Sequence, residues 1–171
     1  MGREAPKRET YMRETYMREA IRLAEEGLRA GDGGPFGCVV VHTGRDGEAK
    51  VVGRGNNRVT STHDPTAHAE IVAIREACQA LGTFELADCE LYTTCEPCPM
   101  CLAAVYWARI PRLYYANTRQ DAAAIDFDDE QIYREISLPL EARRLQMIPL
   151  LREEAQAAFR EWAAKPDKTR Y

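Results

Sequence analysis

The sequence predicts an α/β protein in which a mixed sheet carries helices on both faces. Two β-rich runs, residues 36–42 and 50–56, are joined by a turn containing Gly44 and Gly47, which is typical of a hairpin. Segments of strand and helix character then alternate to the end of the chain, as in a sheet with crossover helices. No stretch rich in Gly, Ser or Pro interrupts the chain, so we expect residues 1–171 to form a single domain.

The N-terminal region holds a short tandem duplication. The letters RETYM occur twice between residues 8 and 17. A period of five matches neither helix nor strand, so we assign this stretch neither an element nor a function. Helical periodicity begins at Met17, with Ile21 and Leu28 on one face, and Gly31 is the expected C-terminal cap.

After the hairpin the sequence predicts three more helices and three more strands, and then a final helix. Asp64 is the expected N-cap of the first helix, with Pro65 in its first turn, and Gly82 ends it. The next helix is expected to begin just after Cys98. The expected elements are a helix to residue 81, a strand at 89–94, a helix at 99–108, a strand at 112–116, a helix at 129–137, a strand at 145–150 and a helix at 152–164.

Composition limits the classes of partner. The net charge is -4 and the pI is about 5.5, which argues against a surface that grips nucleic acid by its phosphates. No apolar stretch has the length of a signal peptide or of a membrane span, so we expect a cytoplasmic protein. Disulfides are rare in that compartment, and six cysteines therefore suggest a metal or chemistry before they suggest bridges.

Three residues form a candidate metal site. Cys98 and Cys101 are three apart at the start of a helix, so both thiols lie on one face and can reach one ion. Their thiolates lie at the positive end of that helix, which lowers a thiol pKa and favours metal binding. His68 lies at the start of a different helix and is the third expected ligand. Three protein ligands leave the fourth tetrahedral position of a zinc ion open, which is typical of catalytic zinc.

Glu70 is the candidate catalytic residue. It is two residues from His68, a spacing that separates side chains on a regular helix, so only the geometry of a helix start can bring both to one cavity. The pattern H-x-E followed by P-C-x-x-C is nevertheless typical of zinc deaminases. In such a site zinc makes hydroxide available at neutral pH. Glu70 takes the water proton and delivers protons to the ring nitrogen and the departing ammonia.

Two other readings of the cysteines are open. Cys95, Cys98 and Cys101 together resemble the start of an iron–sulfur run, but Val105 stands where the bacterial ferredoxin pattern has its next cysteine. A closed structural zinc site with Cys95 as fourth ligand is the second reading, and it leaves Glu70 without a role. Cys95 ends a strand, and a thiol in that position is more often packed than bound to metal.

The chain resembles the cytidine deaminase superfamily and, within it, the bacterial guanine deaminases. The metal motifs are shared by the whole superfamily, and the string DPTAHAE at residues 64–70 is also typical of tRNA adenosine deaminases. The segment Phe127-Asp128-Asp129 and the terminal Tyr171 point to guanine deaminases. The other matching segments are GGPFG at 33–37, NN at 56–57, TCEPCPMC at 94–101, YWAR at 106–109 and IY at 132–133.

The resemblance implies a fold, an activity and a set of site residues. The fold is a three-layer α/β/α sandwich of the cytidine deaminase type with about five strands, and the activity is hydrolysis of guanine to xanthine and ammonia. One zinc is bound per subunit, and bacterial members are dimers that exchange C-terminal segments. The implied substrate-binding residues are Asn57, which hydrogen-bonds the purine, Phe36 and Trp107, which wall the base pocket, Asp129, which accepts purine N–H groups, and Tyr171, which closes the site.

Residue chemistry supports guanine at Asp129. Guanine presents N–H donors at N1 and on its exocyclic amine, and a carboxylate is a pure acceptor. The N1 atom of adenine is an acceptor and faces a carboxylate badly. By sequence alone, Asp128 and Asp129 also suit the solvated start of a helix, where acidic groups are favourable.

Three alternative functions are open at this point. A guanosine deaminase shares the Phe-Asp-Asp pattern, a tRNA adenosine deaminase shares the metal motifs, and a non-catalytic zinc-binding interaction domain needs only the ligands. The acidic pI disfavours the tRNA enzyme. The intact pair of His68 and Glu70 disfavours the non-catalytic domain. We expect a small purine substrate, a homodimer and neither nucleic acid nor a membrane as partner.

Overall fold

A computed structural model describes the backbone of residues 4–170 and the side chains of residues 9–170. The chain divides into two compact units, residues 1–129 and residues 130–171, which are described separately. No helix in the described part of the chain is long and apolar enough to cross a membrane.

The first unit is built on a four-stranded mixed sheet in the order β2-β1-β3-β4. Strand β1 (Gly37–Thr43) pairs antiparallel with β2 (Ala49–Asn56), as the hairpin pattern predicts, and antiparallel with β3 (Cys89–Cys95). Strand β4 (Arg112–Asn117) pairs parallel with β3 and forms the opposite edge from β2. A parallel pair needs a crossover connection, and α4 (Pro99–Trp107) supplies it.

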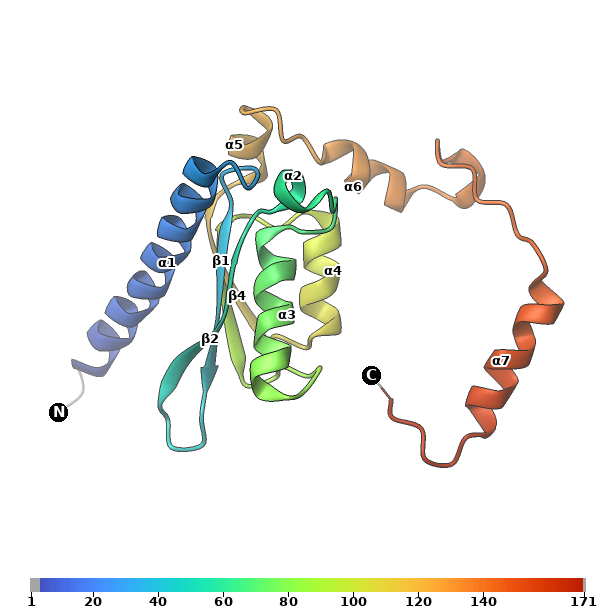
Figure 1. Cartoon of the computed structure of the whole chain (residues 1–171), viewed down its shortest axis with the longest axis horizontal. Coiled ribbons are helices and arrows are strands. Elements are labelled where there is room, and N and C mark those ends of the chain that lie inside the picture. The colour runs from blue at the N-terminus through green and yellow to red at the C-terminus, as the bar shows by residue number, and fades with distance from the viewer. Residues whose placement is uncertain (1–3, 171) are drawn as a thin grey trace. The chain divides into compact units, whose positions relative to one another are not determined.

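Helices cover both faces of this sheet, which confirms the predicted three-layer class (Figure 1). Helix α1 (Glu4–Ala30) lies on one face, where Val39, Val41 and Tyr92 form a core with Tyr16. Helices α3 (Ala69–Leu81) and α4 lie on the other face, over Cys38 and Val40 among others. The side chains of β1 alternate between these two cores, which explains its continuous apolar run.

Helix α1 corrects the reading of the duplicated N-terminal stretch. The helix includes both copies of RETYM, because its face is set by packing and not by the five-residue period. Successive copies turn by about 140° on a helix, so equivalent residues have different environments. Tyr16 is buried against the sheet, whereas Tyr11 is 65% exposed.

The start of α3 differs from the sequence prediction by several residues. Asp64 is not its N-cap; residues 64–67 form a turn in which the Asp64 carboxylate accepts from the backbone N–H of Thr66, and His68 is the N-cap. Helix α3 ends at Gly82, as predicted. A short helix, α2 (Val59–Thr62), precedes this turn and was not predicted.

Helix α3 packs closely on β2 because two residues of that strand lack a side chain. A Cβ atom at Gly55 would lie 2.1 Å from the carbonyl oxygen of Ala69, and one at Gly53 would lie 2.2 Å from that of Ala73. These contacts place the first turn of α3 directly on the end of the sheet.

The remaining elements of the first unit follow the prediction with one addition. Helix α4 begins after Cys98, and β4 covers the predicted strand at 112–116. Helix α5 (Arg119–Ala123) was missed, although Thr118 and Asp121 form a capping box that marks its start.

The second unit contains α6 (Glu130–Ser137), a 3-10 turn at Leu140–Ala142 and α7 (Arg152–Ala164). Both helices match the predicted segments. The strand predicted at 145–150 is not formed, so the described residues contain four strands and not about five. A strand requires a neighbouring strand, and the described residues of this unit form none; Pro149 also lacks an N–H donor.

Candidate metal centre and active site

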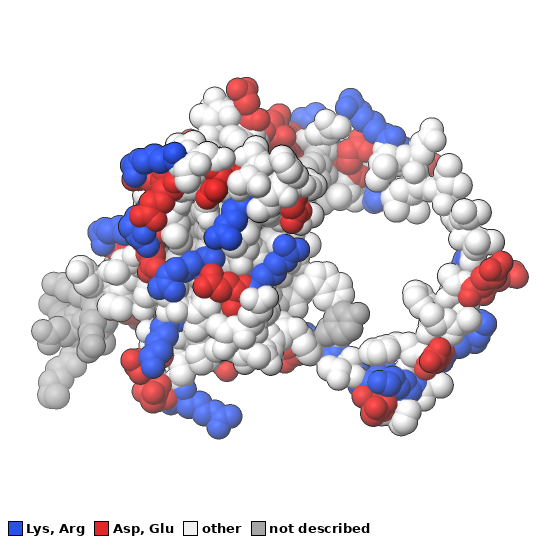
Figure 2. Space-filling model, in the orientation of Figure 1, with Lys and Arg blue, Asp and Glu red and all other residues white. Residues whose placement is uncertain are grey.

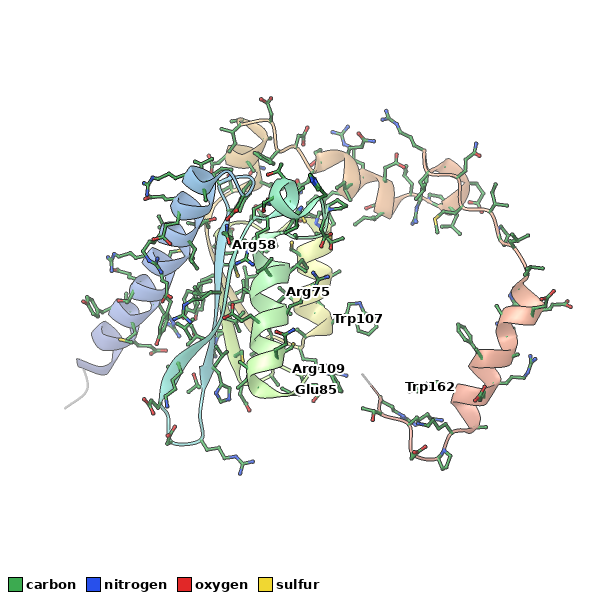
Figure 3. The ribbon with its side chains drawn as sticks, viewed as in Figure 1. Arg58, Arg75, Glu85, Trp107, Arg109 and Trp162 are labelled. Carbon is green, nitrogen blue, oxygen red and sulfur yellow. The ribbon has the colours of Figure 1, made fainter. Side chains whose placement is uncertain are left out.

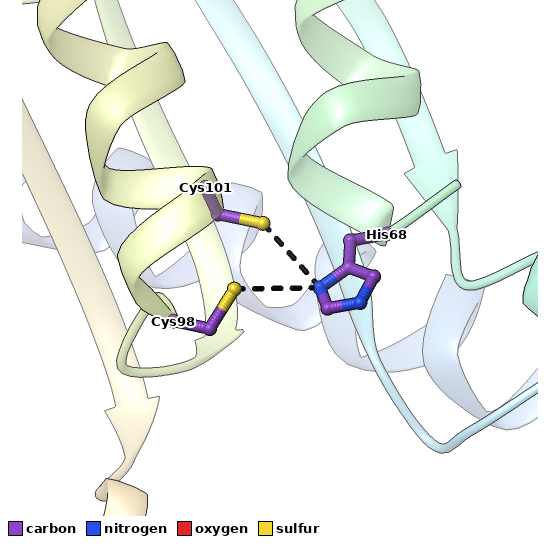
Figure 4. Close-up of side chains that lie close together, drawn as sticks. All are labelled: His68, Cys98 and Cys101. Atoms are coloured by element: carbon purple, nitrogen blue, oxygen red, sulfur yellow. Dashed lines mark hydrogen bonds between the residues drawn. The ribbon is translucent and has the colours of Figure 1, made fainter. Parts of the chain in front are cut away.

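Two helix starts meet at one end of the sheet and bring the predicted metal ligands together. His68 is the N-cap of α3 and Cys98 is the N-cap of α4, both with extended backbone. Pro99 follows Cys98 at the first helical position, where its missing N–H is harmless. Cys101, in the first turn of α4, is fully buried and faces His68 (Figure 4).

The distances among these three side chains fit a zinc ion. The Nδ1 atom of His68 lies 3.6 Å from the Sγ atom of Cys98 and 3.5 Å from that of Cys101. Zn–S bonds near 2.3 Å and a Zn–N bond near 2.0 Å at a tetrahedral angle imply an N···S separation of about 3.5 Å. All three ligand atoms lie within 4.8 Å of one another, and they form a group suited to a metal.

The electrostatics of the thiols also suit a cation. A hydrogen bond from Cys101, together with one from His68, lowers the pKa of Cys98 to about 4. The hydrogen bond to Cys98, together with burial, raises the pKa of Cys101, and the hydrogen bond with Cys98 raises the pKa of His68. A lowered pKa favours the thiolate form of Cys98, which is the form of cysteine that binds zinc.

Glu70 lies beside this cluster. Because His68 is extended and not helical, the two-residue spacing does not separate the side chains, and Glu70 forms a hydrogen bond with Cys101. Glu70 is only 6% exposed. Burial raises its pKa, so the carboxyl group has a high affinity for a proton.

Cys95 is separate from the metal group. Its thiol donates to the carbonyl oxygen of Thr118 at 3.5 Å, and burial raises its pKa to about 11. The group that could hold a metal consists of His68, Cys98 and Cys101 without it. A zinc ion held by these three residues alone would keep a fourth coordination position open, which argues against the closed site and the iron–sulfur reading.

Asn57 lies in the loop after β2 and is 4% exposed. Its side-chain oxygen accepts from the backbone N–H groups of Gly34 at 3.3 Å and Val59 at 3.2 Å. A Cβ atom at Gly33 would lie 2.1 Å from this oxygen, so the approach needs glycine. The oxygen is therefore engaged, and the amide presents its N–H group as a donor.

Phe36 and Phe127 form an aromatic corner. Their ring centroids lie 4.9 Å apart at an interplanar angle of 89°, the edge-to-face arrangement that aromatic pairs prefer. A Cβ atom at Gly34 would lie 2.8 Å from Phe127 and 2.9 Å from Phe36. The sequence pointed to Phe127 only as part of a motif; its contact with Phe36 required the structure.

Asp129 is half-buried at the end of the first unit. Burial and then the charge of Cys98 raise its pKa. The charge of Cys98 thus acts on this carboxylate, and the role of Asp129 in binding the base stays a prediction.

Two predicted residues are not placed in this group. Trp107 ends α4, about 13 Å along the helix axis from Cys98. Its side chain is 67% exposed and extends away from the helix (Figure 3). Its place in the base pocket stays a prediction, and Tyr171 lies outside the described residues.

Comparison with known proteins agrees with this geometry. Residues 10–117 match the family model of the cytidine and deoxycytidylate deaminase zinc-binding region. This range includes all three residues of the candidate metal group, together with Glu70.

Among curated proteins, the chain is 47% identical to the guanine deaminase of Bacillus subtilis over 152 residues, which cover 89% of this chain and 94% of that protein. It is 47% identical to a tRNA-specific adenosine deaminase of Agrobacterium fabrum over 92 residues, which cover 54% of this chain and 57% of that protein.

Among solved structures, the Bacillus subtilis guanine deaminase superposes with a TM-score of 0.86 at 47% identity, covering 92% of this chain and 98% of that chain. A guanine deaminase from Nitrosomonas europaea superposes with a TM-score of 0.61 at 34% identity, covering 88% of this chain and 84% of that chain. Taken together with the His/Cys/Cys group, these matches show that the chain is a zinc-dependent deaminase and belongs to the cytidine and deoxycytidylate deaminase family.

Proposed function

We propose that the protein hydrolyses guanine to xanthine and ammonia. The observation that carries this proposal is the extent of the likeness to the Bacillus subtilis guanine deaminase, which spans 152 of 171 residues. A stretch of that length must include Asp129 and most of α6. The likeness to the tRNA-specific adenosine deaminase of Agrobacterium fabrum spans 92 residues and covers 54% of the chain.

The chemistry of the implied substrate-binding residues supports guanine. Asn57 presents an N–H donor, which complements an acceptor on the base. Asp129 presents acceptors, which complement the N1–H and amino groups of guanine. Phe36 and Phe127 offer aromatic surface for the flat ring.

The residues have distinct roles in the proposed reaction. His68, Cys98 and Cys101 would hold zinc, which when bound supplies a nucleophile by making water acidic at neutral pH. Glu70 accepts the water proton and passes protons to the ring nitrogen and then to the leaving amine. Its buried position and raised pKa suit a group that must both take and release protons. A C–O bond forms at C2 of guanine, the C2–N2 bond breaks, and ammonia leaves.

The surface charge supports a small substrate over tRNA. On the face that Figure 2 shows, Lys and Arg side chains are interspersed with Asp and Glu. Several arginines of the first unit are paired: Arg109 donates to Glu85 at 2.9 Å, and Arg75 lies 3.8 Å from Asp64. Basic side chains that are neutralised locally contribute little to phosphate binding.

We further propose that residues 1–171 act as one deaminase domain within a homodimer that exchanges C-terminal segments. No described residue of 130–170 is buried, so the second unit has no core of its own. Its exposed apolar side chains need a partner surface. These side chains belong to Ile132, Ile136, Leu138, Leu140, Leu145, Met147, Ile148, Leu150, Leu151, Phe159 and Trp162. In this proposal Tyr171 closes the partner's site over the purine.

An ammonia-release screen tests the proposed substrate. The purified protein is assayed with guanine, guanosine, adenine, adenosine, cytosine, cytidine and a tRNA anticodon stem-loop. We expect guanine to have the highest kcat/KM by at least about 100-fold. Preference for guanosine assigns a nucleoside deaminase, and inosine in the stem-loop assigns a tRNA deaminase. If none of these substrates releases ammonia, the proposed activity is refuted and the protein is a non-catalytic zinc-binding domain.

A further inference from the structure

We propose that Glu96 is a positioning residue, which holds the segment 117–129 in place against residues 96–98 and thereby aligns Phe127 and Asp129 with the candidate zinc site. This inference rests on the proposed guanine deaminase function. Glu96 is two residues before Cys98 and lies outside the P-C-x-x-C motif. That motif therefore assigns it no role in the reaction.

Hydrogen bonds join the ends of β3 and β4 around Glu96. The backbone N–H of Glu96 donates to the carbonyl oxygen of Asn117 at 2.8 Å. The Asn117 amide donates to the carbonyl oxygen of Thr94 at 2.9 Å, and the Cys95 thiol donates to that of Thr118. The Glu96 carboxylate adds a bond of a different kind, because its Oε2 atom accepts from the backbone N–H of Arg119 at 3.2 Å.

That last bond caps a helix from outside. Arg119 is the first residue of α5, and its N–H has no acceptor within the helix. The capping box of Thr118 and Asp121 satisfies other groups of this first turn. The Glu96 side chain thus provides an acceptor for the N–H of Arg119, and its negative charge lies at the favourable end of the helix.

Helix α5 in turn fixes the position of Phe127. The carbonyl oxygen of Ala122 accepts from the backbone N–H groups of Ile125 and Phe127, and Ala122 is 8% exposed. Asp126 takes a left-handed conformation with φ of 70°, which turns the chain back toward α5. Phe127 then contacts Phe36, and Asp129 follows two residues later. A shift at the start of α5 therefore also moves Phe127 and Asp129, the two residues that we propose to contact the substrate.

The metal ligands do not depend on this connection. Cys98 and Cys101 are held by the start of α4, and His68 is held by the start of α3 on the sheet. Loss of the Glu96 carboxylate is therefore expected to weaken guanine binding while zinc content stays unchanged. A role confined to stability would lower the melting temperature without a selective effect on substrate.

The test compares Glu96→Ala and Glu96→Gln in the zinc-loaded full chain. The glutamine variant keeps an acceptor of the same reach and is expected to recover most of the lost function. Glu85→Ala is the matched control, because Glu85 accepts from Arg109 on an exposed surface at the other end of α4. Guanine affinity is measured by calorimetry in a Glu70→Gln background, where turnover is blocked, and KM and kcat are measured with Glu70 intact.

We expect Glu96→Ala to weaken guanine binding and raise KM roughly 10-fold, the effect of one lost charged hydrogen bond, with a smaller change in kcat. In a double-mutant cycle with Asp129→Asn, the two changes should be less than additive, since both act on the same contact. Amide hydrogen exchange should accelerate at residues 119–127 and not in α3.

Unchanged guanine affinity in Glu96→Ala, loss of zinc from that variant, or full additivity with Asp129→Asn would each overturn the proposal. If the Glu70→Gln protein with Glu96 intact binds no guanine, the proposed function fails first. Faster exchange at residues 119–127 then shows that the connection exists but serves a different substrate, and unchanged exchange refutes the connection itself.

Discussion

The side-chain oxygen of Asn57 accepts a hydrogen bond from the backbone N–H of Gly34, and this bond decides which way the amide points. The neighbouring N–H of Val59 donates to the same oxygen. Two donors on one atom fix it as the oxygen, because a nitrogen there would face both N–H groups. Asn57 is thus set as a donor before any substrate arrives, and glycine at residue 33 leaves room for its side-chain oxygen.

Replacement of Asn57 by aspartate tests this donor. The variant keeps an oxygen for Gly34 and Val59 but replaces the N–H group by a second acceptor. We expect kcat/KM for guanine to fall about 10- to 100-fold, through loss of a hydrogen bond and an unfavourable acceptor–acceptor contact. Steady-state kinetics beside zinc analysis measures the effect. An unchanged kcat/KM at full zinc content would remove Asn57 from the substrate site.

Removal of metal ligands should remove zinc. We expect the purified protein to hold one zinc per chain, and a variant that combines His68→Ala with Cys98→Ala to hold almost none, because one remaining thiol cannot retain the ion. Cys78→Ala is the control, since Cys78 is partly buried on α3 and lies outside the metal group. Elemental analysis after dialysis against a weak chelator measures occupancy. Full occupancy in the double variant contradicts the ligand assignment.

Glu70→Gln should separate metal binding from catalysis. The amide has nearly the size of the carboxyl group but cannot relay protons, so we expect kcat to fall about 10²- to 10⁴-fold with zinc retained. Glu76→Gln is a matched control on the same helix, where Glu76 is exposed and accepts from the backbone N–H of Arg54. Ammonia release by the two variants gives the comparison. Retention of more than about a tenth of the turnover would show that Glu70 has another role.

Asp129→Asn should act mainly on recognition of the base. An amide offers one donor and one acceptor where guanine needs acceptors, and the charge of the bond is lost. We expect a loss of about 1.5–3 kcal/mol in kcat/KM for guanine. Asp126→Asn is the control, because Asp126 is exposed and its left-handed backbone tolerates asparagine. Equal kinetics for the two variants would exclude Asp129 from the site.

Deletion of Arg170 and Tyr171 tests the proposed closing role of the C-terminus. We expect zinc content and dimerisation to survive, because neither the metal ligands nor α7 is touched, and kcat/KM for guanine to fall at least about tenfold as water enters the site. Size-exclusion chromatography and kinetics of the truncated protein are compared with the full chain. A dimer with normal kinetics would show that the tail is dispensable, as short charged termini commonly are.

The sequence by itself determined the elements whose signals are local. The hairpin, the strand before Cys95 and the helices at 99–107 and 152–164 follow from turn residues, alternation and periodicity over short windows. The candidate metal group was likewise predictable, since two cysteines three apart and a histidine before a helix restrict the chemistry to a few possibilities.

Only the tertiary structure decided features that depend on distant neighbours. The period of the RETYM repeat gave no sign of a helix, but this stretch is part of α1, and Tyr16 packs against Tyr92 of β3. The β-like pattern at 145–150 met no adjacent strand within its unit and stayed irregular. Glu70 lies beside the metal group for two reasons. Gly53 and Gly55 allow α3 to pack closely on the sheet, and His68 precedes the helix in an extended conformation. A sequence records which contacts are chemically possible, and the packing of remote segments selects those that are made.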